Sequence, residues 1–394
     1  MDKDTMASYS RRDFLTGLCT TVLAHSEILR LADEPESWAQ TQIPSVSPGQ
    51  FEIQRVAADV YFALAQPWAL ANSNTAIFVN SSDVLVVDAQ SHPAAATALI
   101  AQIRKEVTSK PVRWLVNTHF HWDHTQGNSA YVSGGSKLDI VASQATNLLM
   151  SQLLVPRLRA ALDPSSPGPR GSQQVARQLE ELRQRAAKVN SEAEKAPIVE
   201  RIAQLEFFAD EMKDFKPTLP TITFEKSYVI RDKHHDLHLE FHGLGHTAGD
   251  VVVFCPQKRL VVTGDVYHPG WPGFTDSYPQ LWPKTIDSIA NLQFDLILPG
   301  HGRVQHSGRD MAGQRNYIEE LAERVITGRK TGQSVADLQR TITASSLKSL
   351  GSRAFMPAAT TEDIERGVKE NIDSMYDRVE RVSFSGSEPL RLRQ

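Results

Sequence analysis

The feature that most constrains this chain is a run of histidine and aspartate side chains that directly follows a short apolar segment. Residues 112–117 (VRWLVN) are predicted to form a buried strand, and residues 118–124 read THFHWDH. Four metal-competent side chains therefore lie on the loop at the carboxyl end of a strand: His119, His121, Asp123 and His124. This spacing can direct the first two to one metal ion and the last two to a second. Imidazole and carboxylate are ligands that zinc prefers.

Three further candidate ligands follow later apolar strands. His246 lies in GLGHTAGD, Asp265 ends LVVTGD, and His301 lies in LILPGHG. Each has a glycine beside it, and glycine lets the backbone turn tightly and leaves space around a site. A single histidine in such a place would be explained by packing or capping. Seven such residues at four strand ends predict a metal centre instead.

The elements predicted around these residues form two similar halves. The first half has strands at 50–64 (a pair), 75–79, 84–88 and 112–117, with a helix at 93–107. The second half has strands at 237–241, 251–255, 260–263 and 296–298, with a helix at 285–292. Two β/α halves of this kind favour two sheets that face each other, with helices outside.

Taken together, HxHxDH, GHTxGD, TGD and PGHG resemble the metallo-β-lactamase superfamily over about residues 51–305. The resemblance implies an α/β fold, the four-layer αβ/βα sandwich, with the site at one edge between the sheets. It implies that a first metal ion is held by His119, His121 and His246, a second by Asp123, His124 and His301, and that Asp265 bridges the two. Asp88, in VVD, matches a family aspartate that supports the metal-binding loop from behind.

The same resemblance implies two zinc ions, with iron or manganese as alternatives, and a hydroxide held between them that attacks the substrate. Asp123 would also orient this hydroxide. Hydrolases of the thioesterase-like, lactonase-like and phosphoesterase-like kinds usually have aspartate at the place of Asp265, whereas β-lactamases commonly have Cys or Ser there. We therefore expect hydrolysis of an ester, thioester or lactone. The alternatives are a β-lactam hydrolase and a mononuclear iron oxidoreductase similar to persulfide dioxygenases.

Aromatic residues near these motifs indicate a small-molecule substrate with an apolar portion. Trp122 lies inside the histidine motif, Trp68 precedes it in the chain, and Tyr267 and Trp271 follow Asp265. Packing in the core is the alternative for each of these aromatic residues. His268 could hydrogen-bond a substrate carboxylate or oxyanion, or could be an ordinary loop residue.

The regions outside the two halves have different compositions. Residues 1–32 contain SRRDFL and a short apolar stretch, which predict a twin-arginine signal and export to the periplasm, with a cytoplasmic protein as the alternative. Residues 33–50 are predicted to be a linker, and residues 51–310 the catalytic domain. This domain contains a helical insertion at about 145–216, whose hairpin at 173–212 could cover the site, contact a second subunit or simply face solvent. Residues 311–394 are predicted to be helices packed on the domain.

Composition excludes several partners. The 42 Lys and Arg residues against 46 Asp and Glu residues leave a net charge of −4, which weighs against a nucleic-acid partner. No stretch reaches the roughly 18 consecutive apolar residues of a membrane-spanning helix. The 2 cysteines cannot make a disulfide framework. The composition indicates no particular oligomeric state.

Overall fold

The computed structural model describes residues 51–65, 72–133, 137–166, 174–306, 308–351, 355–356 and 359–385. The predicted twin-arginine signal, the predicted linker and Trp68 lie outside these residues. In this part of the chain, no helix combines the length and the apolar character needed to cross a membrane.

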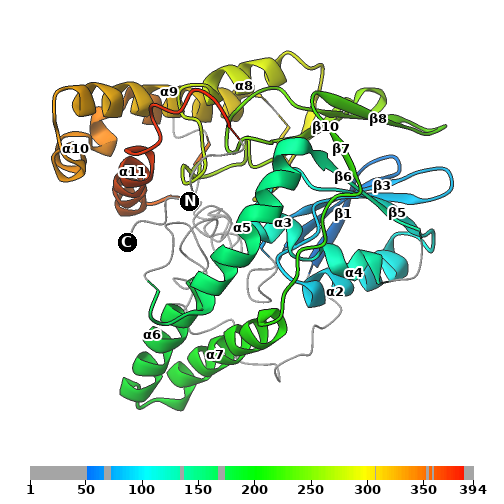
Figure 1. Ribbon diagram of the computed structural model, residues 1–394, viewed down its shortest axis with the longest axis horizontal. Coiled ribbons are helices and arrows are strands. Elements are labelled where there is room, and N and C mark those ends of the chain that lie inside the picture. The colour runs from blue at the N-terminus through cyan, green and yellow to red at the C-terminus, as the bar shows by residue number, and fades with distance from the viewer. Residues whose placement is uncertain are drawn as a thin grey trace, which may run out of the picture.

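Two β-sheets lie together at one side of the molecule, at the right in Figure 1. The first sheet has its strands in sequence order: β1 (Phe51–Ala57), β2 (Val60–Ala65), β3 (Thr75–Val79), β4 (Val84–Val87), β5 (Val112–Val116), β6 (Asp139–Ser143) and β7 (Ile222–Phe224). The second sheet has the order β12-β11-β10-β9-β8: β8 (Ser227–Arg231), β9 (Asp236–Glu240), β10 (Val252–Cys255), β11 (Leu260–Gly264) and β12 (Leu296–Pro299). Strands β4 to β7 pair in parallel, as do β11 and β12.

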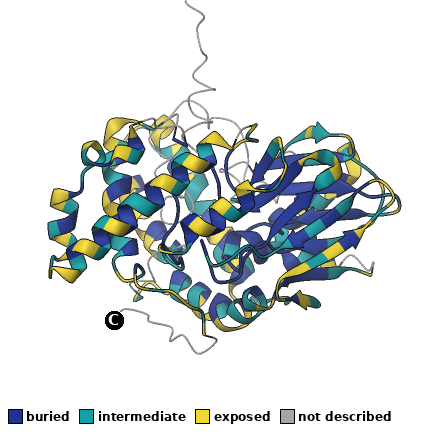
Figure 2. Cartoon of the chain, turned by 90° about the horizontal axis from the view of Figure 1, so that it is seen from above, coloured by how far each residue is buried: buried dark blue, intermediate teal, exposed yellow. Residues whose placement is uncertain are grey.

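The central strands are apolar on both faces because both faces are covered. In β4, Leu85 and Val87 pack in the core between the two sheets, whereas Val84 and Val86 pack against α2 (Pro93–Glu106). The outer face of the second sheet is covered by α8 (Trp282–Ala290) and α9 (Arg309–Lys330). Figure 2 shows buried residues concentrated in the strands and on the inner sides of the helices. The predicted sandwich of two sheets with outer helices is confirmed.

Between β6 and β7 the chain forms three long helices: α5 (Gln144–Leu162), α6 (Val175–Lys188) and α7 (Glu192–Met212). Helices α6 and α7 lie side by side and project from the body of the molecule (Figure 1), where the sequence predicts a hairpin. They share a small apolar core that includes Leu182 and Phe208. Two short helices, α3 (Trp122–Thr125) and α4 (Asn128–Val132), follow β5.

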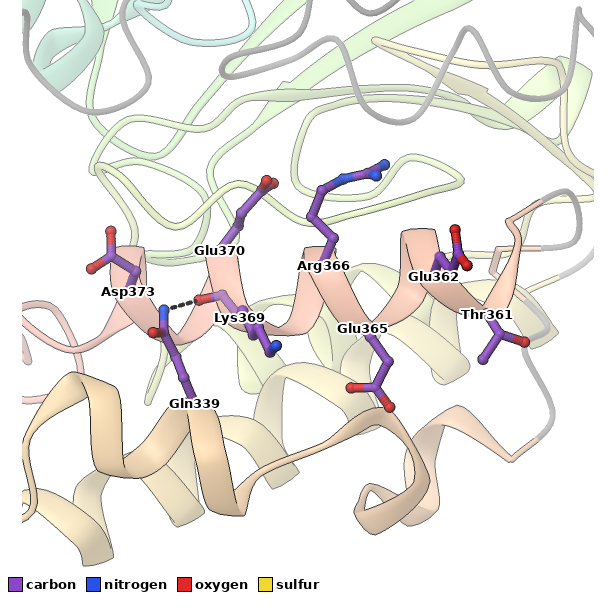
Figure 3. Close-up of a pocket in the computed structure, with 8 residues that line it drawn as sticks. All are labelled: Gln339, Thr361, Glu362, Glu365, Arg366, Lys369, Glu370 and Asp373. Carbon is purple, nitrogen blue, oxygen red and sulfur yellow. Dashed lines mark hydrogen bonds between the residues drawn. The ribbon is translucent and has the colours of Figure 1, made fainter.

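The residues after β12 form further helices. They are α9, α10 (Val335–Thr341) and α11 (Thr361–Met375), with the 3-10 helices η4 (Ala344–Ser346) and η5 (Lys348–Leu350); a further one, η3 (Pro256–Lys258), joins β10 to β11. Helix α9 packs against α8, α11 against α9, and α10 against α11. A capping box formed by Ser334 and Asp337 is present at the start of α10. Gln339 Nε2 of α10 donates to the carbonyl oxygen of Lys369 in α11 over 3.0 Å (Figure 3).

One carboxylate attaches α7 to the first sheet's outer layer. Helix α2 begins after His92, whose own side chain does not cap it. Instead, Glu211 Oε1 accepts a hydrogen bond from the backbone N–H of Ala94 over 2.8 Å, and Glu211 Oε2 lies 2.7 Å from His92 Nδ1. An acidic group here satisfies an N–H that has no partner within the helix and complements the positive end of the helix dipole.

We expect the substitution Glu211→Ala to lower the free energy of unfolding by about 1–3 kcal/mol, because it leaves a part-buried N–H and the His92 ring without a partner. Urea unfolding followed by circular dichroism measures this. The matched control is Glu206→Ala, which removes an exposed pair with Arg183 and should cost less than about 1 kcal/mol. Equal effects of the two substitutions would contradict the assigned contact.

Candidate metal centre

The predicted ligands meet because their strands end at neighbouring edges of the two sheets. His119 and His121 lie on the loop after β5, and α3 places Asp123 and His124 one helical turn further on. His246 lies between β9 and β10, and Asp265 and His301 follow β11 and β12. Strands β11 and β12 are parallel, with Gly264 opposite Pro299, so their carboxyl ends deliver Asp265 and His301 to the same place.

The structure brings together all the side chains predicted as ligands. They form two buried groups that could each hold a metal ion, with ligand atoms within 4.8 Å of one another: His119, His121, His246 and Asp265 in the first, and Asp123, His124 and His301 in the second. Asp265 also faces the second group, because its Oδ2 lies 3.3 Å from His301 Nε2 and its Oδ1 lies 3.6 Å from His124 Nε2. The carboxylate of Asp265 thus lies between the two groups.

Each of the five rings has one nitrogen held from outside the cluster. The partners are Thr118 Oγ1 for His119 (3.1 Å), Asp276 Oδ2 for His121 (2.9 Å), Asp88 Oδ2 for His124 (2.7 Å), Gly273 O for His246 (3.2 Å) and Asn72 O for His301 (3.1 Å). Outer partners of this kind set the orientation of rings that bind metals.

Several nitrogen and oxygen atoms that face the inside of the cluster lack a hydrogen-bond partner, and a metal ion would supply the missing interaction. Among the described residues, Nε2 of His119, His124 and His301 and Oδ1 of Asp265 are buried without a hydrogen-bond partner. His121 Nδ1 and His246 Nε2 lie 2.9 Å apart, as expected of two ligands aimed at a common ion. Buried polar atoms normally have a partner. This set of nitrogen and oxygen donors therefore fits a pair of metal ions.

Asp88 lies behind the histidine loop, where the sequence predicts support for it. Its Oδ1 accepts from the backbone N–H of Thr118 over 2.8 Å, while its Oδ2 contacts His124. Asp88 has a left-handed backbone, with φ of 70°, which aspartate adopts more readily than most residues. One carboxylate therefore connects the end of β4, the end of β5 and one ring of the cluster.

The glycines beside the ligands are required by close approach. A Cβ atom at Gly300 would lie 2.3 Å from Asp265 Oδ1, which would displace that carboxylate. At Gly264, whose φ is +52°, a Cβ atom would lie 2.7 Å from Thr118 Oγ1. Glycine at these positions lets the loops that carry the ligands pack against one another.

Charge and burial oppose each other throughout the cluster. Burial and the neighbouring His124 and His121 lower the pKa of His119 well below its ordinary value, which favours the neutral, metal-binding form. Burial alone would raise the pKa of Asp265, but His301 and His124 hold that pKa well below its usual range. Burial alone would lower the pKa of His301, yet Asp265 and Asp123 raise it to about 10. The ionised carboxylates thus attract positive charge to this place.

Two residues that the sequence patterns do not single out complete the surroundings of His121. Asp276 Oδ2 contacts His121 Nε2, and Arg157 of α5 donates from both Nη atoms to Asp276 over 2.8 and 2.7 Å. The guanidinium of Arg157 also lies over the ring of Phe120, 5.2 Å from its centre. The helical insertion therefore contacts the cluster through an ion pair.

The residues predicted to contact the substrate differ in burial and in their distance from the cluster. His268 is buried beside the cluster, with its ring centre 5.5 Å from that of His301 and its Nε2 without a partner. Trp122 is half-buried at the start of α3.

Tyr267 and Trp271, which the sequence predicts to lie near the substrate, are buried. Both side chains are buried in the apolar cluster formed with the C-terminal helices, and Trp271 packs against Gly367 and Tyr317. The chain after Asp265 turns toward these helices, so it carries the two aromatic side chains away from solvent.

Comparison with known proteins decides the family. The model of the metallo-β-lactamase superfamily matches residues 69–301, more than half of the chain. The chain belongs to the metallo-β-lactamase superfamily. A search of curated proteins gave no match.

One solved structure shows the same fold at low sequence identity, and others are similar over part of the chain. A sec-alkylsulfatase from Pseudomonas sp. is 17% identical, with a TM-score of 0.59, over 87% of this chain and 52% of its own. The present chain thus spans about half the length of that protein. A metallo-β-lactamase from Pontibacter korlensis is also 17% identical, with a TM-score of 0.44, over 65% of this chain and 94% of its own.

We expect Asp276→Asn to weaken binding of one metal ion about 10–100-fold, because His121 loses the charged partner that orients its ring. Competition with a chromophoric chelator measures the affinity of each ion. The control Asp287→Asn removes the charge of an exposed aspartate paired with Arg315 and should change neither affinity. Unchanged affinities in the Asp276 variant would show that this contact does not orient His121.

Proposed function

We propose that this protein is a binuclear zinc-dependent hydrolase that cleaves an ester, thioester or lactone. The observation that carries the proposal is the pair of buried His/Asp groups joined by Asp265. In this proposal, one ion is held by His119, His121 and His246, the other by Asp123, His124 and His301, and Asp265 contacts both. The mixed imidazole and carboxylate donors suit zinc, and iron or manganese would accept the same atoms.

When bound, the metal pair would acidify a shared water molecule and polarise the carbonyl group of the substrate. In this proposal, side chains of the protein orient the attacking group. Asp123 Oδ2 accepts from Asn72 Nδ2 over 2.9 Å and lies 3.2 Å from His301 Nε2. Burial would raise the pKa of Asp123, but His124 and His301 hold it below its usual range, so its carboxylate stays ionised and able to accept a proton or orient the attacking group.

His268 is the residue that we propose contacts the substrate in addition. It is buried, its Nδ1 lies 3.2 Å from the carbonyl oxygen of Pro269, and its Nε2 has no partner among the described residues. Burial lowers the pKa of His268, which favours the neutral ring. Because a carbonyl oxygen only accepts, the proton of the neutral ring lies on Nδ1, and Nε2 would accept a hydrogen bond from a donor group of the substrate. Donation to a substrate oxyanion or carboxylate would need the protonated ring.

Two alternatives differ from this proposal in metal and substrate. A mononuclear iron oxidoreductase would need only one of the two groups of ligands. The second group here is also buried, and its two histidine rings are also held by hydrogen-bond partners outside the cluster. A β-lactam hydrolase would use the same ions. Aspartate at position 265, where β-lactamases commonly have Cys or Ser, favours an ester, thioester or lactone over a β-lactam.

We expect Asp265→Ala to reduce the metal content below two ions per chain and to abolish hydrolysis, because the groups lose the carboxylate that faces both. Mass spectrometry of metals and a hydrolysis assay measure the two effects. Asp295→Ala, at an exposed position paired with Arg259, is the matched control. Full activity in the Asp265 variant would overturn the bridging role.

We expect close to two zinc ions per chain in protein purified without added metal. A panel of an ester, a thioester, a lactone and a β-lactam, assayed with and without chelator, should show chelator-sensitive cleavage of one of the first three. One iron per chain with no hydrolysis would instead support the oxidoreductase and make persulfides the next substrates to assay.

A further inference from the structure

Helix α5, the first helix of the insertion, is tied at its start to the loop that carries His246. Its N-cap residue Ser143 donates from Oγ to the carbonyl oxygen of Gly249 over 2.7 Å. Thr146, in the first turn of the helix, donates from Oγ1 to the same oxygen over 2.9 Å. Gly249 belongs to the GHTAGD segment, which also contains His246. Two hydroxyl groups of the insertion therefore hold the loop of one candidate ligand.

The middle of α5 packs against the loop that carries the other two histidines of the first group. Phe120, which lies between His119 and His121 in the chain, is buried in an apolar cluster. The other buried members of this cluster belong to α5: Met150, Leu153 and Leu154. Full burial of a phenylalanine side chain contributes about 1.5–3 kcal/mol. The backbone between these two candidate ligands is therefore anchored to α5.

Farther along α5, Arg157 contacts the group that orients His121. Its two Nη atoms donate to the two carboxylate oxygens of Asp276 over 2.8 and 2.7 Å, and Asp276 Oδ2 lies 2.9 Å from His121 Nε2. Two parallel hydrogen bonds of this kind fix the plane of a carboxylate. The same guanidinium lies 5.2 Å from the centre of the Phe120 ring. Arg157 thus holds both the partner of His121 and the residue that precedes it.

The second group of candidate ligands is supported from other parts of the chain. Asp88, which follows β4, contacts His124. Asn72 contacts the other two ligands, because its Nδ2 donates to Asp123 Oδ2 over 2.9 Å and its carbonyl oxygen lies 3.1 Å from His301 Nδ1. Neither Asp88 nor Asn72 belongs to the helical insertion. The two groups therefore have different outer supports.

We propose that Arg157 is a positioning residue for the first metal group, through which α5 raises the affinity of that group for its ion while leaving the second group unaffected. This inference rests on the proposed binuclear centre and not on the identity of the substrate. It gives the helical insertion a role in metal binding, in addition to any contact with substrate or with a second subunit. Arg157 acts through Asp276, which in turn orients His121.

The test measures metal binding and not turnover. Metal-free wild type, Arg157→Met and Arg157→Lys are titrated with zinc against a chromophoric chelator, which gives the affinity of each ion. Cadmium NMR of the cadmium-loaded protein assigns each ion to its group, with His246→Ala and His301→Ala as references that each remove one ligand. Methionine keeps an apolar side chain beside Phe120 and removes the hydrogen-bond donors.

Arg157→Met should weaken binding of the first-group ion about tenfold, because the carboxylate that orients His121 loses both of its guanidinium donors. Binding of the second-group ion should stay at the wild-type affinity. Arg157→Lys should give an intermediate affinity for the first-group ion, since lysine keeps the charge without the planar fork.

Two further variants separate positioning from a purely structural role. Arg183→Met removes an exposed arginine of the same insertion, paired with Glu206, and should change neither affinity. Arg157→Met introduced into Asp276→Asn should cause no further loss, because the two residues act in series on one ring. An arginine that only stabilises the fold would lower the melting temperature of the metal-free protein and leave both affinities unchanged, or weaken both ions equally.

Equal affinity of the first group in the wild type and Arg157→Met, equal weakening of both groups, or fully additive losses in the double variant would overturn the proposal. If Arg157→Met does not fold, a wild-type affinity in Arg157→Lys overturns it instead. The number of ions bound by the wild type tests the binuclear centre separately. A single ion would overturn that centre, and the Arg157 assignment would then stand only if the ion lies in the first group and is weakened by Arg157→Met.

Discussion

Five imidazole rings and two carboxylates share one buried volume, and the balance of their charges is the constraint on which the rest of the structure depends. Asp123 and Asp265 stay ionised only because positive charge lies beside them, and His124 and His301 supply it where metal ions would. Every ring is held by a group outside the cluster. Those outer groups come from the ends of β-strands and from loops, and the helical insertion supports one of them, Asp276, through Arg157.

The helical insertion reaches this centre through one aspartate. Asp276 contacts His121 on one side and Arg157 of α5 on the other. Arg381 of the C-terminal segment contacts the neighbouring residues Ser277 and Tyr278. Parts of the chain outside the two sheets therefore contribute to the environment of the candidate metal ligands.

Local patterns predicted most of the sandwich but not all of its strands. Strands β4 and β10 are continuous apolar runs, and β5 and β11 are mostly apolar, so short apolar segments with turns beside them predict these strands. Strands β6 and β8 have five residues each and β7 has three, and β8 exposes Val229 together with Ser227 and Arg231. Segments this short give a weak periodic signal. The burial of Tyr267 and Trp271 has no local signal either. Their nearness to Asp265 in sequence suggests substrate contact, and the C-terminal helices form the apolar cluster in which both side chains lie.

The sequence by itself determined the family, the sandwich and the set of candidate ligands, because each ligand directly follows an apolar strand and such strands are recognised from adjacent residues. Only the tertiary structure decided what lies behind the ligands. Asp276 is 155 residues from His121 and 119 from Arg157 along the chain, and neither distance leaves a local signal. The sequence gives the identity of each candidate ligand. The balance of charges around these ligands depends on which distant segments the fold brings together.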